Sequence, residues 1–308
     1  MKLSEILSPS FKSMQEAEPR HPSGILWRRC LSICSEFCEA VVKSGYLSWE
    51  QMLHAACRYC LGASKQHGVI FWQIDQEGRV HDGKIMYYRP DCHRDKTRHP
   101  TWVSSLLRHR DPFLYAQHES SHCLFGLHLL SHTDSNKGHT DCHRLHRFVS
   151  PPAMVKGHTD CTDLHRSLAL AADGKNLCPS VESVCHKKTP VTSVESVWDC
   201  KSVCVVEAEK TAFILSEIYP QYIWLAAGGL GELQVDKFRP LRGHKVILFP
   251  DTDPDGKAFR RWYDIAQEVM ASPFWEGSPP IRVSPILELH ATPAQKSAKI
   301  DLIEFLLN

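Results

Sequence analysis

The sequence predicts a mixed α/β protein, in which an α+β region with two helices and a β-hairpin precedes a C-terminal parallel sheet flanked by helices. Three patterns lead to this prediction. Apolar strand-like segments alternate with amphipathic segments after residue 201, strand-forming residues flank a turn within residues 68–88, and apolar residues recur at helical spacing within residues 25–63. With 308 residues, of which 43% are hydrophobic, the chain can bury a substantial core.

The N-terminal part of the chain divides into a tail and a helical segment. Residues 1–23 are polar, contain two prolines and are expected to form a flexible tail. The α+β region is expected to span residues 24–130, and it opens with two apolar-periodic segments separated by the sequence KSGYLS. This spacing predicts two helices. Their apolar positions are Leu26, Ile33, Phe37 and Val41 in the first helix, and Met52, Leu53, Ala56 and Tyr59 in the second.

The rest of the α+β region contains the predicted hairpin. Residues 68–88 read GVIFWQIDQEGRVHDGKIMYY, in which two runs rich in Val, Ile and aromatic residues flank a turn at DQEG. This pattern is typical of two antiparallel strands. TWVSSLLRHR, residues 101–110, predicts a short helix, and HCLFGLHLL, residues 122–130, predicts a short apolar segment that closes the region.

Residues 131–200 differ in kind from the segments on either side. KGHTDCHRLHR, from Lys137, returns nearly unchanged as KGHTDCTDLHR, from Lys156. Each copy has too few apolar residues to build a core, and Pro, Ser, Thr and Asp are frequent in the segment. We therefore expect a low-complexity insertion that is mostly disordered.

The cysteine motifs do not predict a zinc site. They are Cys57 with Cys60, Cys142 with His146, and Cys161 with His165. The first is a single C-x-x-C motif inside a helical pattern, which favours buried helix cysteines over a metal site. The other two arise from the duplicated segment, and a tetrahedral site needs ligands held by a small fold.

Charge and targeting signals exclude some classes of protein and favour others. The formal net charge is +1, so a polyanion site would have to be local. The N-terminal sequence lacks the apolar run and cleavage site of a signal peptide, and no run reaches the roughly 20 apolar residues of a membrane helix. Thirteen cysteines without a signal peptide indicate reduced thiols. We expect a soluble, cytoplasmic protein without a membrane partner.

The C-terminal region, residues 201–308, predicts a parallel sheet with a site at one edge. The strand-like runs VCVV, YIWLA, KVILF and IRV each precede a helical segment, and such sheets bind ligands beyond the carboxyl ends of their strands. Glu207 follows the first run, and Asp251, Asp253 and Asp255 follow the third. Neighbouring carboxylates repel each other, and Mg²⁺, which takes oxygen ligands, would relieve this repulsion. Mn²⁺ is the alternative ion.

Other interpretations of DTDPDG, residues 251–256, are weaker. An EF-hand loop requires a glutamate at its twelfth position, which is Trp262 in this sequence. A phosphatase-type nucleophile motif requires a glycine directly after the second aspartate, where this chain has Pro254. A solvated acidic turn is the remaining alternative, since Pro and Gly favour turns.

The order of these elements resembles the toprim domain of primases and topoisomerases. Its signature is a glutamate after the first strand, a glycine turn after the second, and D-x-D with a following glycine after the third. VVEAEKTAFIL, WLAAGGLGEL and VILFPDTDPDGKAF supply them in that order, and KIDLIEFL is similar to the toprim closing helix. The resemblance implies that Glu207 acts as general acid or base and that Asp251 and Asp253 hold Mg²⁺, with Asp255 as an auxiliary ligand.

The resemblance extends to most of residues 25–308. The hairpin sequence, TWVSSLL, HCLFGLHLL, VEAEKTA and WLAAGG together resemble an uncharacterised family of bacterial mobile-element proteins. In that family a primase-like N-terminal half, here residues 24–130, precedes a toprim-like domain, here residues 201–308. Two departures stand out: Ala208 replaces the glycine usual after the catalytic glutamate, and the zinc ribbon common in the family is absent.

Five further residues are candidate contacts for phosphate or nucleic acid. Lys210, in the first turn of a predicted helix, could meet a phosphate or be a solvated surface lysine. Gly228 and Gly229 lack the spacing of a dinucleotide or Walker loop, and they predict a turn that lets backbone approach the acidic crevice. Arg89 and Lys96 belong to RPDCHRDKTRH, the most basic short run, which could contact a nucleic-acid backbone or be a solvated loop.

These features lead to a hypothesis of Mg²⁺-dependent phosphodiester chemistry on nucleic acid. Primase-like nucleotidyl transfer in replication or mobilisation of a bacterial mobile element is the leading form. The expected partners are nucleotides and nucleic acid, with single-stranded DNA favoured; a replicative helicase or mobilisation proteins are further candidates. The alternatives are a non-catalytic nucleic-acid-binding accessory protein with the same fold and a toprim-type nuclease.

Overall fold

The computed structural model describes residues 31–110, 112, 122–132 and 201–307. The predicted tail and nearly all of the predicted insertion, with its Cys/His pairs, lie outside the described residues. The described segments all belong to one compact unit. None of the described helices is long and apolar enough to cross a bilayer.

The two predicted N-terminal helices are present as α3, Glu36–Lys43, and α4, Trp49–Arg58, but α3 is shorter than predicted: Ile33 precedes it, and Leu26 lies outside the described residues. Ser35 begins α3, and its hydroxyl accepts a hydrogen bond from the N–H of Cys38. A capping box begins α4, in which Ser48 and Gln51 each accept from the backbone N–H of the other. These caps satisfy N–H groups that a helix cannot satisfy by itself.

An antiparallel sheet follows, with strand order β1-β2-β3-β4. Its strands are β1, Gly62–Ala63; β2, Val69–Ile74; β3, Val80–Met86; and β4, Thr101–Trp102. The pairing of β2 with β3 confirms the predicted hairpin, and α5, Val103–Arg110, confirms the predicted helix after it. One hairpin face, with Phe71 and Met86, joins the main core, whereas the other, with Trp72, packs with α5.

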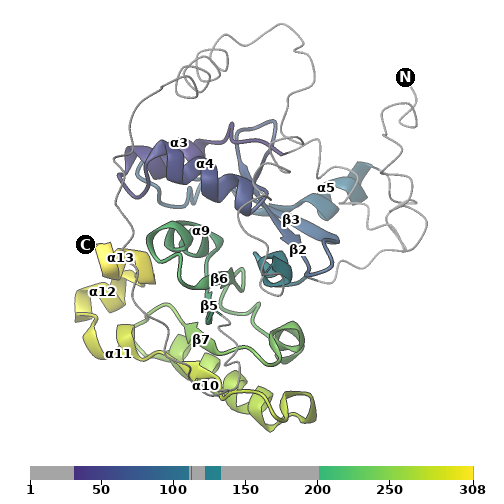
Figure 1. Cartoon of the computed structure of the whole chain (residues 1–308). Coiled ribbons are helices and arrows are strands. Elements are labelled where there is room, and N and C mark those ends of the chain that lie inside the picture. The colour runs from purple at the N-terminus through teal and green to yellow at the C-terminus, as the bar shows by residue number, and fades with distance from the viewer. Residues whose placement is uncertain (1–30, 111, 113–121, 133–200, 308) are drawn as a thin grey trace, which may run out of the picture. The chain divides into compact units, whose positions relative to one another are not determined.

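The C-terminal sheet is parallel throughout, as predicted, with strand order β6-β5-β7-β8 (Figure 1). Its strands are β5, Val203–Val206; β6, Ile223–Ala226; β7, Val246–Phe249; and β8, Arg282–Val283. The helical elements between and after the strands are α9, Glu209–Ile218; η3, Val235–Leu241; α10, Lys257–Ala271; η4, Pro273–Trp275; α11, Ile286–His290; α12, Pro293–Ala298; and α13, Leu302–Leu307. Every residue of β5 and β6 is buried, as expected for central parallel strands.

The two sheets share a single main core. Helix α4 packs against α9, and the hydroxyl of Tyr59 donates to the carbonyl of Trp224 at 2.8 Å. Phe125 forms a β-bridge with Ala226 just before the short helix η2, Leu127–His132, so the predicted apolar segment is buried beside β6. The α+β region is therefore bonded directly to the edge of the parallel sheet.

Candidate active site

The carboxyl ends of three parallel strands lie at one level of the sheet. Val206, the last residue of β5, pairs with Ala226 of β6 on one side and with Phe249 of β7 on the other. Glu207, Gly228 and Asp251 follow these strand ends. The strand order reverses at β5, since β6 lies on one side of it and β7 on the other. Ligand crevices in open α/β sheets lie at such points.

Glu207 and Asp251 form an electrostatically coupled pair at this point. Both side chains are half-buried. Burial raises the pKa of Glu207, while Lys84 and the backbone N–H of Leu230 oppose the rise. Burial and the nearby charges of Glu207 and Asp301 raise the pKa of Asp251 well above its usual range. In the described part of the chain, no group donates a hydrogen bond to the Asp251 carboxylate. The pair therefore combines solvent access with unfavourable negative charge.

Asp253 is turned to the first turn of α10 rather than to Asp251. Its carboxylate accepts three backbone hydrogen bonds, from the N–H of Asp255 at 2.9 Å, of Lys257 at 3.1 Å and of Ala258 at 2.8 Å. Burial alone would raise its pKa, but these three donors hold the pKa of Asp253 below its usual value. The side chain thus supplies the cap that Gly256 cannot provide.

Asp255 lies farther from the pair. Its side chain is exposed and forms an ion pair with Lys257 at 2.7 Å. The three aspartates predicted to act together therefore have three environments: Asp251 is coupled to Glu207, Asp253 caps a helix, and Asp255 pairs at the surface.

Lys210 is buried and paired inside the protein. Its Nζ lies 3.1 Å from Asp301 and 3.7 Å from Glu304, both at the start of α13. Burial alone would lower its pKa, but these two carboxylates raise the pKa of Lys210. Asp301 also accepts a hydrogen bond from the Thr211 hydroxyl at 3.0 Å. Lys210 therefore ties α9 to α13, and the structure offers it neither as a solvated lysine nor as a directed phosphate ligand.

Lys84 of the hairpin reaches this edge from the other sheet. Its Nζ lies 3.0 and 3.2 Å from the two carboxylate oxygens of Glu209 and donates to the carbonyl of Gly228 at 2.6 Å. Lys84 and Glu209 lie 125 residues apart in the chain, so no local pattern places the lysine at this site. One signal was available: Lys84 lies between Asp82 and Met86 on the inward face of β3, where a charge needs a partner.

The glycine turn after β6 has the backbone conformation that glycine permits. Gly228 has φ +92° and Gly229 has φ +148°. A Cβ at position 228 would lie 3.3 Å from a carboxylate oxygen of Glu209. Both the backbone conformation and the close approach of Glu209 therefore favour glycine at position 228.

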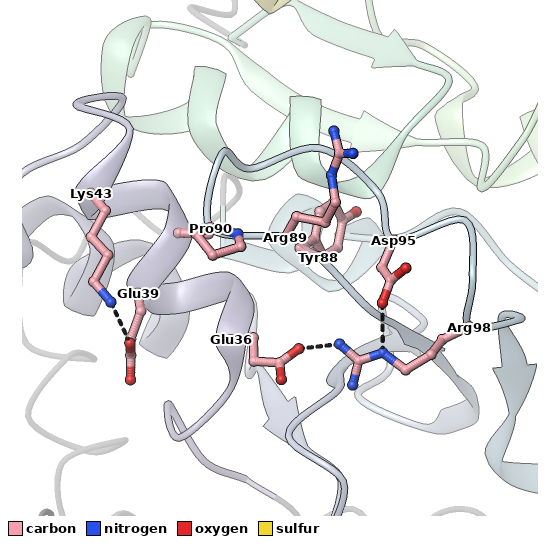
Figure 2. Close-up of a pocket in the computed structure, with 9 residues that line it drawn as sticks. Glu36, Glu39, Lys43, Tyr88, Arg89, Pro90, Asp95 and Arg98 are labelled. Carbon is pink, nitrogen blue, oxygen red and sulfur yellow. Dashed lines mark hydrogen bonds and ion pairs between the residues drawn. The ribbon is translucent and has the colours of Figure 1, made fainter.

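The basic loop after β3 is folded around internal ion pairs. Arg89 is exposed and pairs with Asp91 at 2.8 Å, and Lys96 is exposed. Arg89 borders a cavity of about 250 Å³ between this loop and α3 (Figure 2). Across the same cavity, Arg98 pairs with both Glu36 and Asp95. Two cations of this loop, Arg89 and Arg98, are thus paired with carboxylates.

A divalent cation fits the coupled pair as part of a larger coordination shell. Among the described residues, no three His, Cys, Asp or Glu side chains are grouped to hold a metal ion. Mg²⁺, however, is commonly held by one or two carboxylates, with waters and substrate phosphates completing its shell. Glu207 and Asp251 match this requirement, since a cation would relieve the repulsion that raises the pKa of Asp251.

Comparison with known proteins places the chain in a family. Residues 35–138 and 195–252 match the family described as a domain of unknown function (DUF6371). These segments make up more than half of the chain, which therefore belongs to that family. No curated protein and no solved structure gives a significant match.

Proposed function

We propose that this member of a family of unknown function carries out Mg²⁺-dependent phosphodiester chemistry on nucleic acid, in the form of primase-like nucleotidyl transfer. The observation that carries the proposal is the coupled pair of Glu207 and Asp251 on adjacent parallel strands. Perturbed carboxyl groups at a strand-end crevice are the arrangement expected of an active site. Glu207 raises the pKa of the half-buried Asp251, and no described group donates a hydrogen bond to the Asp251 carboxylate, so no structural role is evident for this arrangement.

The two acids suit different roles. Asp251, with the one lone pair of Asp253 that capping leaves unused, would hold the metal ion. The ion, when bound, would stabilise negative charge on the transferring phosphate. Glu207, whose pKa is raised, is suited to accept the proton of an attacking hydroxyl and to release it later.

The order of elements around the pair supports a toprim-type assignment. A glutamate follows β5, a glycine turn follows the neighbouring strand β6, and Asp-x-Asp follows the neighbouring strand β7. The short helix α13, in the position of the toprim closing helix, is held against α9 by Asp301. On this basis the substrates are nucleotides and a nucleic-acid template, for which single-stranded DNA is our first choice.

A second candidate function is nucleic-acid binding without turnover. Two observations favour it: the Asp253 carboxylate is already engaged by three N–H donors, and Lys210 is held by two carboxylates inside the protein. A toprim-like fold with these groups committed to structure could retain binding while lacking catalysis.

A primer-synthesis assay on a single-stranded template separates the candidates. The full chain is incubated with nucleotides and Mg²⁺ or Mn²⁺, beside Glu207→Gln and Asp251→Asn, with Asp264→Asn, at an exposed acid of α10, as the matched acidic control. We expect metal-dependent products from the wild type and the control, and at least a hundredfold loss in the two site variants. Products that survive both substitutions would exclude this site.

A gel shift and a cleavage assay on the same samples complete the test. Binding without synthesis or cleavage would support the accessory function, and shortened template would support a nuclease. Calorimetric titration with Mn²⁺ alone adds a readout that does not depend on activity: the wild type should bind the ion more tightly than Asp251→Asn.

A further inference from the structure

The glycine turn beside Glu207 presents backbone donors that the protein does not use. The turn runs from Gly228 to Glu232, after β6. Gly228 donates its N–H to the carbonyl of Glu207, and Glu232 donates to the carbonyl of Gly229. By contrast, the N–H groups of Gly229 and Gly231 donate to no acceptor in the described part of the chain. Unpaired N–H groups in turns with left-handed glycines form concave sites for anions.

Lys237 is a second, independent feature that points to an anion-binding site. It lies in η3, and nine-tenths of its side chain is buried. Its Nζ is inaccessible to solvent and makes no hydrogen bond to any described group. An ammonium group carries three donors, and burying it without acceptors is costly. The nearest carboxylate is that of Glu232, at 3.7 Å, which places the ammonium at the far end of the glycine turn.

Lys84 holds the near end of the same turn. Its ammonium donates to the carbonyl of Gly228 and is neutralised by Glu209. The two lysines thus flank the turn, but only Lys84 has its hydrogen bonds satisfied. The titratable groups that face Lys237 are the carboxylates of Glu232 and Glu209 and the thiol of Cys123, which burial keeps neutral, and burial lowers the pKa of Lys237 despite the two carboxylates. An incoming anion would supply the hydrogen-bond acceptors that Lys237 lacks and would add to the charge of Glu232.

We propose that Lys237, together with the N–H groups of Gly229 and Gly231, binds a phosphoryl group next to Glu207. Two sources have this chemistry: the polyphosphate of a nucleotide and the backbone of a nucleic acid. Glu232 occupies the approach to the lysine, but its side chain is 45% exposed and can turn into solvent when the anion enters. Any role of this phosphoryl-binding site in a reaction rests on the proposed function. The inference that the site binds a phosphoryl group does not.

The test measures binding of pyrophosphate to the full chain by calorimetry, without divalent metal. Lys237→Met keeps the length of the side chain and removes the charge, and it should weaken binding about tenfold or more, since hydrogen bonds to charged groups are strong. Lys201→Met is the matched control: Lys201 is an exposed lysine that precedes β5, at the opposite edge of the sheet, and its replacement should leave the affinity unchanged.

A second variant, which should change the affinity in the opposite direction, keeps the test informative if Lys237→Met fails to fold. Glu232→Gln removes the competing carboxylate, and it should tighten pyrophosphate binding several-fold. If neither variant changes the affinity, or if the wild type binds no pyrophosphate, the subsite does not exist and Lys237 is a structural lysine. Repeating the titrations with a nucleoside triphosphate and with a single-stranded oligonucleotide identifies the source, since the true source should show the larger loss in Lys237→Met.

The outcome is separable from the proposed function. Glu207→Gln and Asp251→Asn should abolish nucleotidyl transfer and retain pyrophosphate binding. A protein that binds pyrophosphate through Lys237 but synthesises nothing would keep the subsite and reject the enzyme, and the reverse result would do the opposite.

Discussion

The pKa values of acids in the two sheets are shifted in opposite directions. In the antiparallel sheet, Asp82 is fully buried and accepts hydrogen bonds from the N–H of Gly83 at 2.7 Å and from the N–H and hydroxyl of Ser104 at 3.0 and 2.5 Å. Although burial by itself would raise its pKa, these donors and His122 hold the pKa of Asp82 below its usual value. At the edge of the parallel sheet, Asp251 is half-buried, and its pKa is well above its usual range.

The difference shows that burial alone does not mark a functional acid. The hairpin turn repeats the structural case, since Asp75 accepts from the backbone N–H and Nε of Arg79 and is paired with His81 at 2.9 Å. Donors stabilise the ionised form of these acids. Asp251 instead lies within the electrostatic influence of Glu207 and accepts no hydrogen bond from a described group, which leaves its charge available to a cation or a proton.

The largest effect is expected where the two sheets meet. Lys84→Met leaves the buried Glu209 without its partner, and it should lower the free energy of unfolding by about 3–5 kcal/mol. Urea denaturation measures the change. The double variant with Glu209→Gln should recover most of the loss, because it removes the orphaned charge. A loss below about 1 kcal/mol in the single variant would mean that Lys84 does not tie the sheets together.

The next effect concerns the satisfied acid of the hairpin. Asp82→Ala removes the acceptor for two backbone N–H groups and a hydroxyl, and it should cost about 3 kcal/mol in urea denaturation. Asp91→Ala, at an exposed acid of the neighbouring loop, serves as the control and should change stability little. Equal results for the two variants would contradict a structural role for Asp82.

Asp253 should behave as a helix cap. Asp253→Ala should destabilise the protein by about 1 kcal/mol, since α10 loses its N-terminal acceptor, whereas Asp253→Asn keeps one acceptor oxygen and should cost less. Thermal unfolding of both variants measures the difference. If Asp253→Asn nonetheless abolishes metal binding, the charge of Asp253 has a second use beyond the cap.

The smallest effect is a gain in stability. The folded protein holds a proton on Asp251 at pH values where the unfolded chain has lost it, so stability should fall as pH rises above the usual carboxyl pKa. Asp251→Asn removes this cost and should raise the melting temperature at neutral pH. Its melting temperature should also vary less between roughly pH 5 and 8. A lower melting temperature would show that the Asp251 charge is stabilised by partners.

The elements were predictable because each has a local signature. Helical spacing located α3 and α4, two β-branched runs around DQEG located β2 and β3, and alternating segments located the parallel sheet. The acidic edge followed from one rule about strand ends. Even the capping by Asp253 had a local signal, since an aspartate just before a helix commonly accepts from its first N–H groups.

The partners of charged side chains were not predictable in this way. Lys210 looked like a surface or phosphate-binding lysine, but it pairs with Asp301, which lies 91 residues further along the chain. Lys237 carried no motif at all. The segments that bury a lysine decide whether it is solvated, paired with a carboxylate or left without an acceptor. These segments can be distant in the chain, and helical or strand periodicity does not predict them.

The kinds of element, their order and the strand ends at which Glu207 and the aspartates lie can be read from the amino-acid sequence, because they depend on local spacing and on the geometry of parallel sheets. The electrostatic interaction between Glu207 and Asp251, the neutralisation of Lys84 and Lys210, and the donors without an acceptor become visible only in the folded chain. Electrostatic energies depend on distance and burial, and both are set by contacts between residues far apart in the chain.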